Sequence, residues 1–194
     1  MVGYEDLCDG VVKLVPLGLA DVAEHLAGED AELAHWLNGG PGTRATVEAH
    51  IRRCMSQWSS GGPIHAFGIR TVGISAVGIS AGERQVLVGT LEVQFDRAYL
   101  APDEVNISYG IYPAWRRRGL ATRAVELGCR HAAASSAARA VIRTDVANVA
   151  SAAVARRAGF THLRRRLDSD GAVLDWFVRD LHVTAPPLPP GAPT

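Results

Sequence analysis

The sequence predicts a mixed sheet in an α/β or α+β layer architecture. Residues 105–111 alternate between large and small or polar side chains, which is the period of a strand. Residues 121–132 carry apolar side chains at three-to-four spacing, which is typical of an amphipathic helix. Strand-like segments come first, and helices alternate with strands after residue 112. That order is typical of one sheet packed against layers of helices.

The N-terminal half predicts a strand and two helices before its central strands. Residues 11–16 form the first strand, and Asp21-Val-Ala-Glu24 is a capping-box pattern that opens a helix. A second helix is expected over 46–58, and the cluster at 59–63 ends it. The residues expected on the apolar face of this second helix are Val47, Ile51, Cys54, Met55 and Trp58.

Two further strands are expected over 64–70 and 86–95. Between them lies a tandem repeat, residues 72–81. We interpret it as a hairpin or loop, since two copies are too few for a solenoid. A flap beside an acceptor site is the alternative. The next strand, 105–112, ends at Pro113, because proline cannot donate to a strand ladder.

The C-terminal part predicts a strand over 140–146 and a short helix over 148–157. A closing antiparallel pair follows, with strands at 160–167 and 173–181. Residues 1–181 are long enough to form one domain with a substantial core. The proline-rich segment 182–194 is expected to be a disordered tail.

Composition excludes several classes of protein. The formal net charge is zero, which argues against nucleic acid or an anionic membrane as the main partner. No apolar run reaches the roughly 18–20 residues that span a bilayer. The three cysteines are scattered and the seven histidines show no ligand spacing, so neither a disulfide framework nor a metal is expected. A cytoplasmic location is the default expectation.

The segment Arg116-Arg-Arg-Gly-Leu-Ala121 joins the predicted strand to the predicted central helix. The first turn of a helix has unpaired N–H groups and the positive end of the dipole, so it favours an anion. Gly119 allows close backbone approach, and the arginines add charge. We expect a pyrophosphate here. The alternatives are a solvated arginine patch and a nucleic-acid contact.

This segment resembles the [Arg/Gln]-x-x-Gly-x-[Gly/Ala] signature of the GCN5-related N-acetyltransferase (GNAT) superfamily, which binds acetyl-coenzyme A. Residues 148–160 are similar to its Asn-x-x-Ser…Gly-Phe segment, in the variant of the ribosomal-protein N-terminal acetyltransferase (RimJ/RimL-like) branch. Residues 170–179 are similar to the closing strand of that branch. The resemblance implies a central mixed, mostly antiparallel sheet of about seven strands with about four helices. It also implies that the sheet splays open near Tyr112, with the cofactor in the gap.

The resemblance implies acetyl-CoA as co-substrate and assigns residues to it. Backbone groups at the strand end would pair with the pantetheine arm, and N–H groups near Ile111 and Tyr112 would polarise the thioester carbonyl. The expected cofactor-binding residues are Gly110, Ile111, Tyr112, Pro113, Arg116, Arg117, Arg118, Gly119, Leu120, Ala121, Thr122, Asn148 and Ser151.

A general base is needed because a lysine amine has a pKa of about 10 and an α-amine one of about 8. Many members of the branch carry Glu at the position of Asn106, so the usual base is missing here. Glu104 on the same strand and Glu92 on the preceding strand are the candidate bases, each acting through water. The alternative for each is an ordinary solvated or ion-paired carboxylate.

The residue that usually protonates the leaving thiolate in the family is also replaced. The family often places a Tyr seven residues after the motif Asn, and that position is Ala155 here. Ser151 is the favoured acid and Tyr112 the second candidate, with solvent as a third route.

The resulting hypothesis is direct acetyl transfer to a primary amine, with a protein or peptide N-terminus favoured. A small-molecule amine, such as an aminoglycoside or polyamine, is the alternative acceptor. A non-catalytic acyl-CoA sensor is the alternative of a different class. Because many members of the superfamily dimerise, a homodimer is a further expectation.

Overall fold

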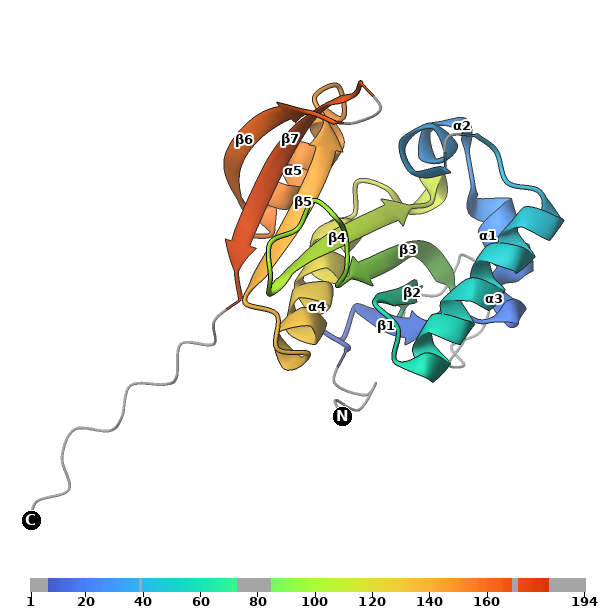
Figure 1. The fold of residues 1–194 in the computed structure, drawn as a ribbon. Helices are drawn as coiled ribbons and strands as arrows, with labels where there is room; N and C mark the ends of the chain where they lie inside the picture. Colours follow the sequence, from blue (N-terminus) through green and yellow to red (C-terminus); the bar gives the residue numbers. More distant parts are fainter. Residues whose placement is uncertain (1–6, 39, 73–84, 169–170, 182–194) are drawn as a thin grey trace, which may run out of the picture.

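A computed structural model describes residues 7–38, 40–72, 85–168 and 171–181. It has one sheet of seven strands in the order β1-β2-β3-β4-β5-β7-β6 (Figure 1). All neighbours are antiparallel except β4 and β5, which are parallel. The expected seven-stranded, mostly antiparallel sheet is confirmed. The strands are β1 (Val12–Pro16), β2 (Ile64–Thr71), β3 (Leu87–Gln94), β4 (Glu104–Ile111), β5 (Arg139–Asp145), β6 (Thr161–Leu167) and β7 (Val173–Asp180).

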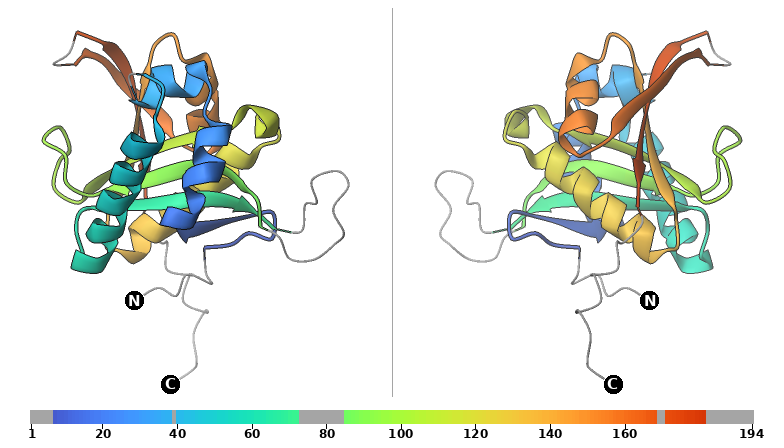
Figure 2. Two further views of the ribbon diagram at one scale, coloured as in Figure 1. Left: turned by 90° about the vertical axis from the view of Figure 1, so that its right-hand side faces the viewer. Right: turned by 90° about the vertical axis from the view of Figure 1, so that its left-hand side faces the viewer.

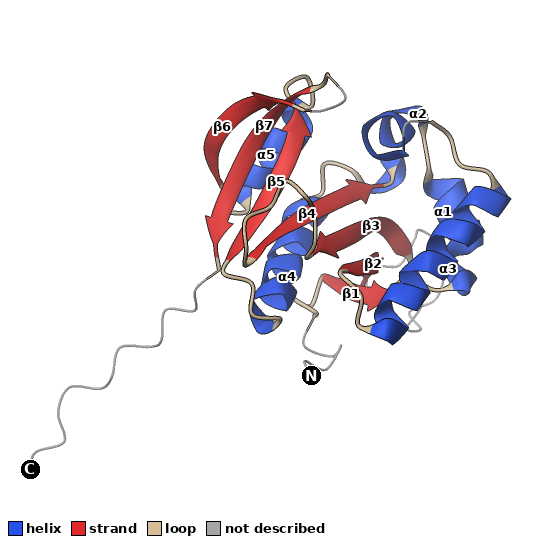
Figure 3. Cartoon of the chain, in the orientation of Figure 1, coloured by secondary structure: helices blue, strands red, loops and turns tan. Residues whose placement is uncertain are grey.

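Helices cover both faces of this sheet (Figures 2 and 3). On one face α1 packs against α3 and both reach the sheet, whereas α4 packs on the opposite face against β1, β3 and β4. The α-helices are α1 (Val22–Gly28), α2 (Ala31–Leu33), α3 (Arg44–Ser60), α4 (Leu120–Ala134) and α5 (Val149–Arg157). A π-helical turn, η3 (Ala34–Asn38), continues α2, and 3-10 turns occur at η2 (Leu19–Asp21) and η4 (Pro113–Trp115).

The main core lies between the sheet and α4. Phe67, Leu91, Ile107 and Leu127 are buried there. Gly128 on α4 faces Leu91 closely enough that an added Cβ would lie 3.2 Å from the leucine methyl. This packing explains why one face of β3 and β4 is continuously apolar, while the other face is free to carry polar groups.

Two details of the N-terminal helices differ from the expectation. The helix at Val22 is present, but Asp21 does not cap it, because the carboxylate accepts the Gly18 N–H and pairs with Arg70. The second helix is longer than expected, and Gly61 ends it in the left-handed conformation. Met55, expected on its apolar face, is exposed.

The parallel pair β4 and β5 is joined over only three residues. Glu104 to Asn106 pair with Arg139 to Val141, and beyond this the two strands separate (Figure 1). Farther along, β5 is instead paired along its whole length with β7. The expected opening of the sheet before Tyr112 is therefore confirmed, and the C-terminal half of β4 has one free edge.

Two expectations fall outside the described residues: most of the tandem repeat at 72–81 and the tail at 182–194. None of the helices that the structure describes has the length and apolarity needed to cross a bilayer.

A buried histidine pair joins α4 to β2. His65 Nδ1 lies 2.7 Å from His131 Nε2, and the Trp58 ring stacks on His65 at a centroid distance of 4.2 Å. Burial, together with the neighbouring His65, lowers the pKa of His131 to about 4. The neutral form of the pair is therefore the one that fits the core.

We predict that acid destabilises the fold through this pair. The unfolded chain takes up a proton at His131 near pH 6.5, whereas the folded chain does so only near pH 4. The free energy of unfolding should therefore fall as pH drops from about 6.5 towards 4. Urea unfolding across this range should show a shallower fall for His131→Gln, with exposed His35→Gln as control. An unchanged slope in His131→Gln would contradict the prediction.

Candidate active site

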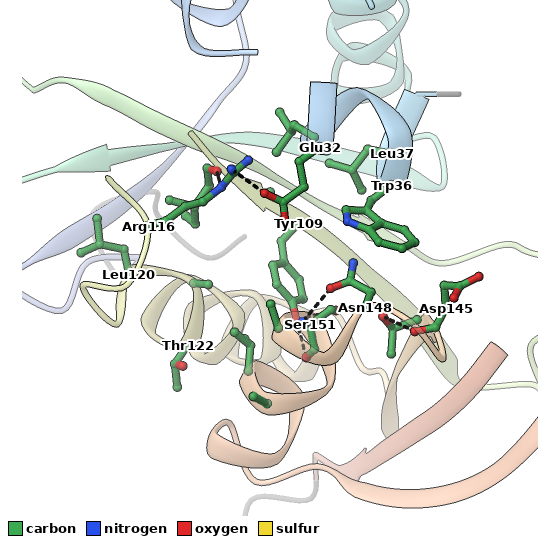
Figure 4. A pocket seen from close by; sticks show the side chains of 18 of the residues that line it. Glu32, Trp36, Leu37, Tyr109, Arg116, Leu120, Thr122, Asp145, Asn148 and Ser151 are labelled. Carbon is green, nitrogen blue, oxygen red and sulfur yellow. Dashed lines mark hydrogen bonds and ion pairs between the residues drawn. The ribbon is translucent and has the colours of Figure 1, made fainter. Parts of the chain in front are cut away.

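A cavity of about 790 Å³ occupies the gap between β4 and β5 (Figure 4). Its walls are α2 with η3, the end of β4, the first turn of α4, and α5. Its size and mixed lining are typical of a small-molecule site. The expected cofactor-binding residues that line this first cavity are Gly110, Ile111, Arg116, Arg117, Gly119, Leu120, Ala121, Thr122, Asn148 and Ser151.

The free edge of β4 presents backbone donors to this cavity. The Tyr112 N–H donates to Val88 O at 2.9 Å on the β3 side. Because successive residues of a strand point their N–H groups to opposite sides, those of Tyr109 and Ile111 face the gap. The Tyr112 N–H, expected to polarise the thioester carbonyl, is therefore already paired with Val88 O, whereas the Ile111 N–H faces the cavity and remains the candidate donor.

The first turn of α4 forms the anion-favouring end of the cavity. Gly119 is left-handed, with φ of 75°, and offers no side chain to cap the helix. Arg117 is also left-handed, with φ of 63°. These two left-handed residues precede α4, whose first turn lines the cavity. Its first N–H groups, at Leu120 to Thr122, suit a phosphate better than a neutral group.

The three arginines of this turn differ in their partners. Arg116 is committed to the fold: it donates to Asp30 and Glu32 at 2.8 Å and to Ile111 O at 3.0 Å. Arg118 lies over the Trp115 ring and does not line the cavity. Arg117 does line it. Among the three side chains, Arg117 is therefore the candidate for binding phosphate, and Arg157 on α5 is a second cation in the lining that was not expected from the sequence.

Asn148 and Ser151 lie on the α5 side of the cavity (Figure 4). Asn148 caps α5 by accepting the Ser151 N–H at 2.9 Å. The Ser151 hydroxyl lies 3.0 Å from the hydroxyl of Tyr109, which also donates to Ser151 O at 3.1 Å. Burial raises the pKa of Tyr109 to about 12, so its hydroxyl is protonated at neutral pH. This second hydroxyl was not singled out from the sequence.

Tyr112 and Pro113 do not line the cavity. The Tyr112 side chain is buried against Gly28 on the other face, where its hydroxyl lies 2.8 Å from His25 Nδ1. Burial raises the pKa of Tyr112, and its hydroxyl is paired with His25 outside the lining of the gap. The structure therefore argues against Tyr112 as an acid and as a cofactor contact.

The two candidate bases lie in different places. Glu104 is at the far end of β4 from Ile111, where it accepts from Ala101 N–H and pairs with Arg139. It lines neither cavity, so the structure argues against it as a base. Glu92 lies on β3 opposite Ser108 and lines a second cavity of about 630 Å³.

This second cavity lies between β3 and β4 on one side and α1 and α3 on the other. It meets the first cavity at Leu33, Leu37 and Tyr109, which line both. Asn106 is buried below it and donates to Gln94 Oε1 at 3.1 Å. Gln94 in turn donates to Glu92 Oε2 at 2.6 Å, so Asn106 is linked through Gln94 to a carboxylate on the adjacent strand.

Three potential metal ligands meet at the wall of the second cavity: His50, Cys54 and Glu92. His50 Nε2 lies 3.5 Å from Cys54 Sγ and 3.6 Å from Glu92 Oε1. Burial, with Glu92 beside it, raises the pKa of Cys54 to about 11. The histidines show no ligand spacing with one another. His50 and Cys54, however, are separated by one helical turn on α3.

The sequence analysis also missed the wall formed by α2 and η3. Glu32, Trp36 and Leu37 lie across the cavity from Asn148 and Ser151 (Figure 4). The signal in the sequence was the apolar pair Trp36-Leu37 beside the glycine-rich segment 39–42.

Solved structures with less than 20% identity share this fold. An acetyltransferase from Salmonella typhimurium that modifies the N-terminal serine of a 50S ribosomal subunit protein is 19% identical, with a TM-score of 0.69 over 89% of this chain and 96% of that one. The microcin C7 self-immunity acetyltransferase MccE, in complex with acetyl-CoA and AMP, is 15% identical, with a TM-score of 0.70 over 89% and 93%. The aminoglycoside enzyme AAC(6')-Ib, in complex with paromomycin and acetyl-CoA, is 13% identical, with a TM-score of 0.68 over 88% and 93%.

No curated protein matches the sequence. The model of the acetyltransferase (GNAT) domain, however, matches residues 12–161, which is most of the chain. That match includes the strand, turn and helix that line the first cavity. The sheet order and the opening between β4 and β5 agree with it. The chain therefore belongs to the GNAT acetyltransferase family.

Proposed function

We propose that this protein transfers an acetyl group from acetyl-CoA to the α-amine of a peptide or protein N-terminus by direct attack. The observation that carries the proposal is the meeting of two cavities at Tyr109, one beside a helix N-terminus and one beside a carboxylate. Acetyl-CoA supplies the activated thioester carbonyl. The first cavity takes this donor and the second takes the amine.

Donor binding is assigned to the backbone of the first cavity. The uncapped turn at Leu120 to Thr122 binds the pyrophosphate, with Arg117 adding charge. The free edge of β4 pairs with the pantetheine arm, and the Ile111 N–H polarises the thioester carbonyl.

Proton transfers are assigned to groups on the two sides of Tyr109. Glu92 accepts the amine proton through water in the second cavity, in place of the Glu that β4 lacks. The hydroxyl pair of Tyr109 and Ser151 donates a hydrogen bond to the leaving thiolate, and solvent supplies the proton that the sulfur finally takes up. Burial raises the pKa of Tyr109 to about 12, so its hydroxyl keeps its proton at neutral pH and remains a hydrogen-bond donor.

The charges of the second cavity support a peptide acceptor over a polycation. Arg53, Arg97 and Glu92 are the ionised side chains that line it, apart from its histidines. A polyamine or aminoglycoside carries several positive charges, and the two arginines would repel it. A peptide with one α-amine and a nearby carboxylate would place its amine near Glu92 and its carboxylate near the arginines.

The test of the proposal is release of free CoA from acetyl-CoA in the presence of amines. A panel should contain peptides with neutral and acidic second residues, polyamines and aminoglycosides. Turnover on the peptides supports the proposal. Turnover on polyamines or aminoglycosides alone would show that the acceptor is a small-molecule amine and not a peptide. Tight acetyl-CoA binding without release on any amine would instead identify a non-catalytic sensor.

We predict that Thr122→Glu weakens donor binding about tenfold or more, which corresponds to about 1.4 kcal/mol. The new carboxylate would repel the pyrophosphate, whereas a negative charge in the first helical turn stabilises the helix. Calorimetric titration with CoA measures the affinity, and Thr122→Gln is the neutral control of equal size. Equal affinities for the Glu and Gln variants would refute phosphate binding at this turn.

We predict that Glu92→Gln lowers kcat/KM about 100-fold near neutral pH. The loss should shrink at high pH, because the free amine then forms without a base. Glu104→Gln is the matched control and should retain activity, since Glu104 lies outside both cavities. A pH–rate profile separates the two variants. A larger loss in Glu104→Gln than in Glu92→Gln would reverse the assignment of the base.

We predict that Arg53→Gln raises KM about two- to fivefold for peptides with an acidic second residue, as expected for losing a solvent-exposed ion pair. The KM of neutral peptides should not change. Arg52→Gln, an adjacent exposed arginine outside the cavity, is the control. If both variants behave alike, Arg53 does not select the acceptor.

A further inference from the structure

The cluster at the wall of the second cavity has the chemistry of a metal site. His50 and Cys54 are one turn apart on α3, so both side chains leave the helix on the same side. Glu92 reaches them from the centre of β3. The three ligand atoms all lie within 4.8 Å of one another.

The two separations measured from His50 Nε2 match those of ligands on one tetrahedral ion. Zn–N bonds of about 2.0 Å and Zn–S bonds of about 2.3 Å place a nitrogen and a sulfur about 3.5 Å apart, and a nitrogen and an oxygen about 3.4 Å apart. The observed separations from His50 Nε2 are 3.5 Å to Cys54 Sγ and 3.6 Å to Glu92 Oε1. The second separation is too long for a hydrogen bond.

The geometry does not fit a Cys–His–Glu catalytic triad. In a triad the histidine uses one ring nitrogen for the nucleophile and the other for the carboxylate. Here Cys54 and Glu92 both approach the same atom, Nε2 of His50. A single nitrogen cannot serve both partners in a proton relay, whereas three ligand atoms gathered within 4.8 Å suit a shared cation.

Charge and the neighbouring residues also fit a divalent ion. A thiolate and a carboxylate together neutralise a 2+ ion, which is needed at a site where Cys54 is only 4% exposed. Gln94 donates to the other oxygen of Glu92 and is itself fixed by Asn106 and Arg97. Such outer hydrogen bonds orient a ligating carboxylate.

We propose that His50, Cys54 and Glu92 bind one Zn²⁺ ion, with the fourth ligand position open to the second cavity. Thiolate and imidazole ligands select zinc over magnesium or calcium. If the proposed function holds, the bound ion also engages the carboxylate of the base Glu92 and stands in the path of the amine. Zinc then inhibits acetyl transfer in competition with the acceptor.

The test uses Co²⁺ as a spectroscopic substitute for Zn²⁺ on the full chain. We expect one Co²⁺ per chain, tetrahedral visible bands and a near-ultraviolet thiolate-to-cobalt band, all removed by competing Zn²⁺. Cys54→Ala should abolish the thiolate band. His50→Gln, at a half-exposed position that does not threaten folding, should weaken affinity more than about 100-fold, since even outer-shell changes cost 10- to 100-fold.

Cys129→Ala is the matched control, because Cys129 is also buried but lies on α4. It should bind Co²⁺ as the unchanged protein does. Absence of stoichiometric binding, or a thiolate band that survives Cys54→Ala in a folded variant, would overturn the proposal.

A second arm measures activity separately from binding. Added Zn²⁺ should raise the KM for the amine in the unchanged protein, and His50→Gln should relieve this effect. Cobalt binding at Cys54 without turnover on any amine would leave the metal site established and the proposed function refuted. Turnover with no metal binding would support the proposed function and refute the metal site.

Discussion

The separation of β4 from β5 is the constraint on which the rest of the site depends. The two strands share only the pairs up to Asn106 and Val141, after which β5 follows β7. Unpaired backbone donors are costly when buried, so a free strand edge inside a domain needs a partner or solvent. The resulting gap is filled only partly, by Tyr109 and the first turn of α5. What remains is the first cavity, with the Ile111 N–H and the N-terminus of α4 directed into it.

A second constraint acts on the opposite face of the same strands. The apolar side chains of β3 and β4 are committed to α4, so their polar side chains face α1 and α3. There Asn106, Gln94, Glu92 and His50 form a continuous polar chain along the floor of the second cavity. Asn106 fixes the amide of Gln94, and Gln94 holds the carboxylate of Glu92 on the same strand, β3.

The two cavities adjoin where helices approach β4 very closely at Gly110. An added Cβ there would lie 2.6 Å from Leu33 and 2.8 Å from Leu37. These leucines and Tyr109 line both cavities, so the boundary between them is apolar. A neutral amine passes such a boundary more easily than an ammonium ion, because charge is costly to desolvate. In the proposed reaction the amine therefore loses its proton in the second cavity, on the side where Glu92 lies, before it reaches the thioester.

The sequence by itself determined the strands, the longer helices and the strand–turn–helix that forms the anion-favouring turn. These features depend on local periodicity and on residues adjacent in the chain, such as Gly119 before the first turn of α4. Only the tertiary structure decided which side chains act together. Arg116 matches the motif but is held by Asp30, Tyr112 turns to His25, and Glu104 lies at the wrong end of its strand. Conversely, Tyr109 meets Ser151, and Glu92 meets His50 and Cys54, across separations of about 40 residues that no local pattern encodes.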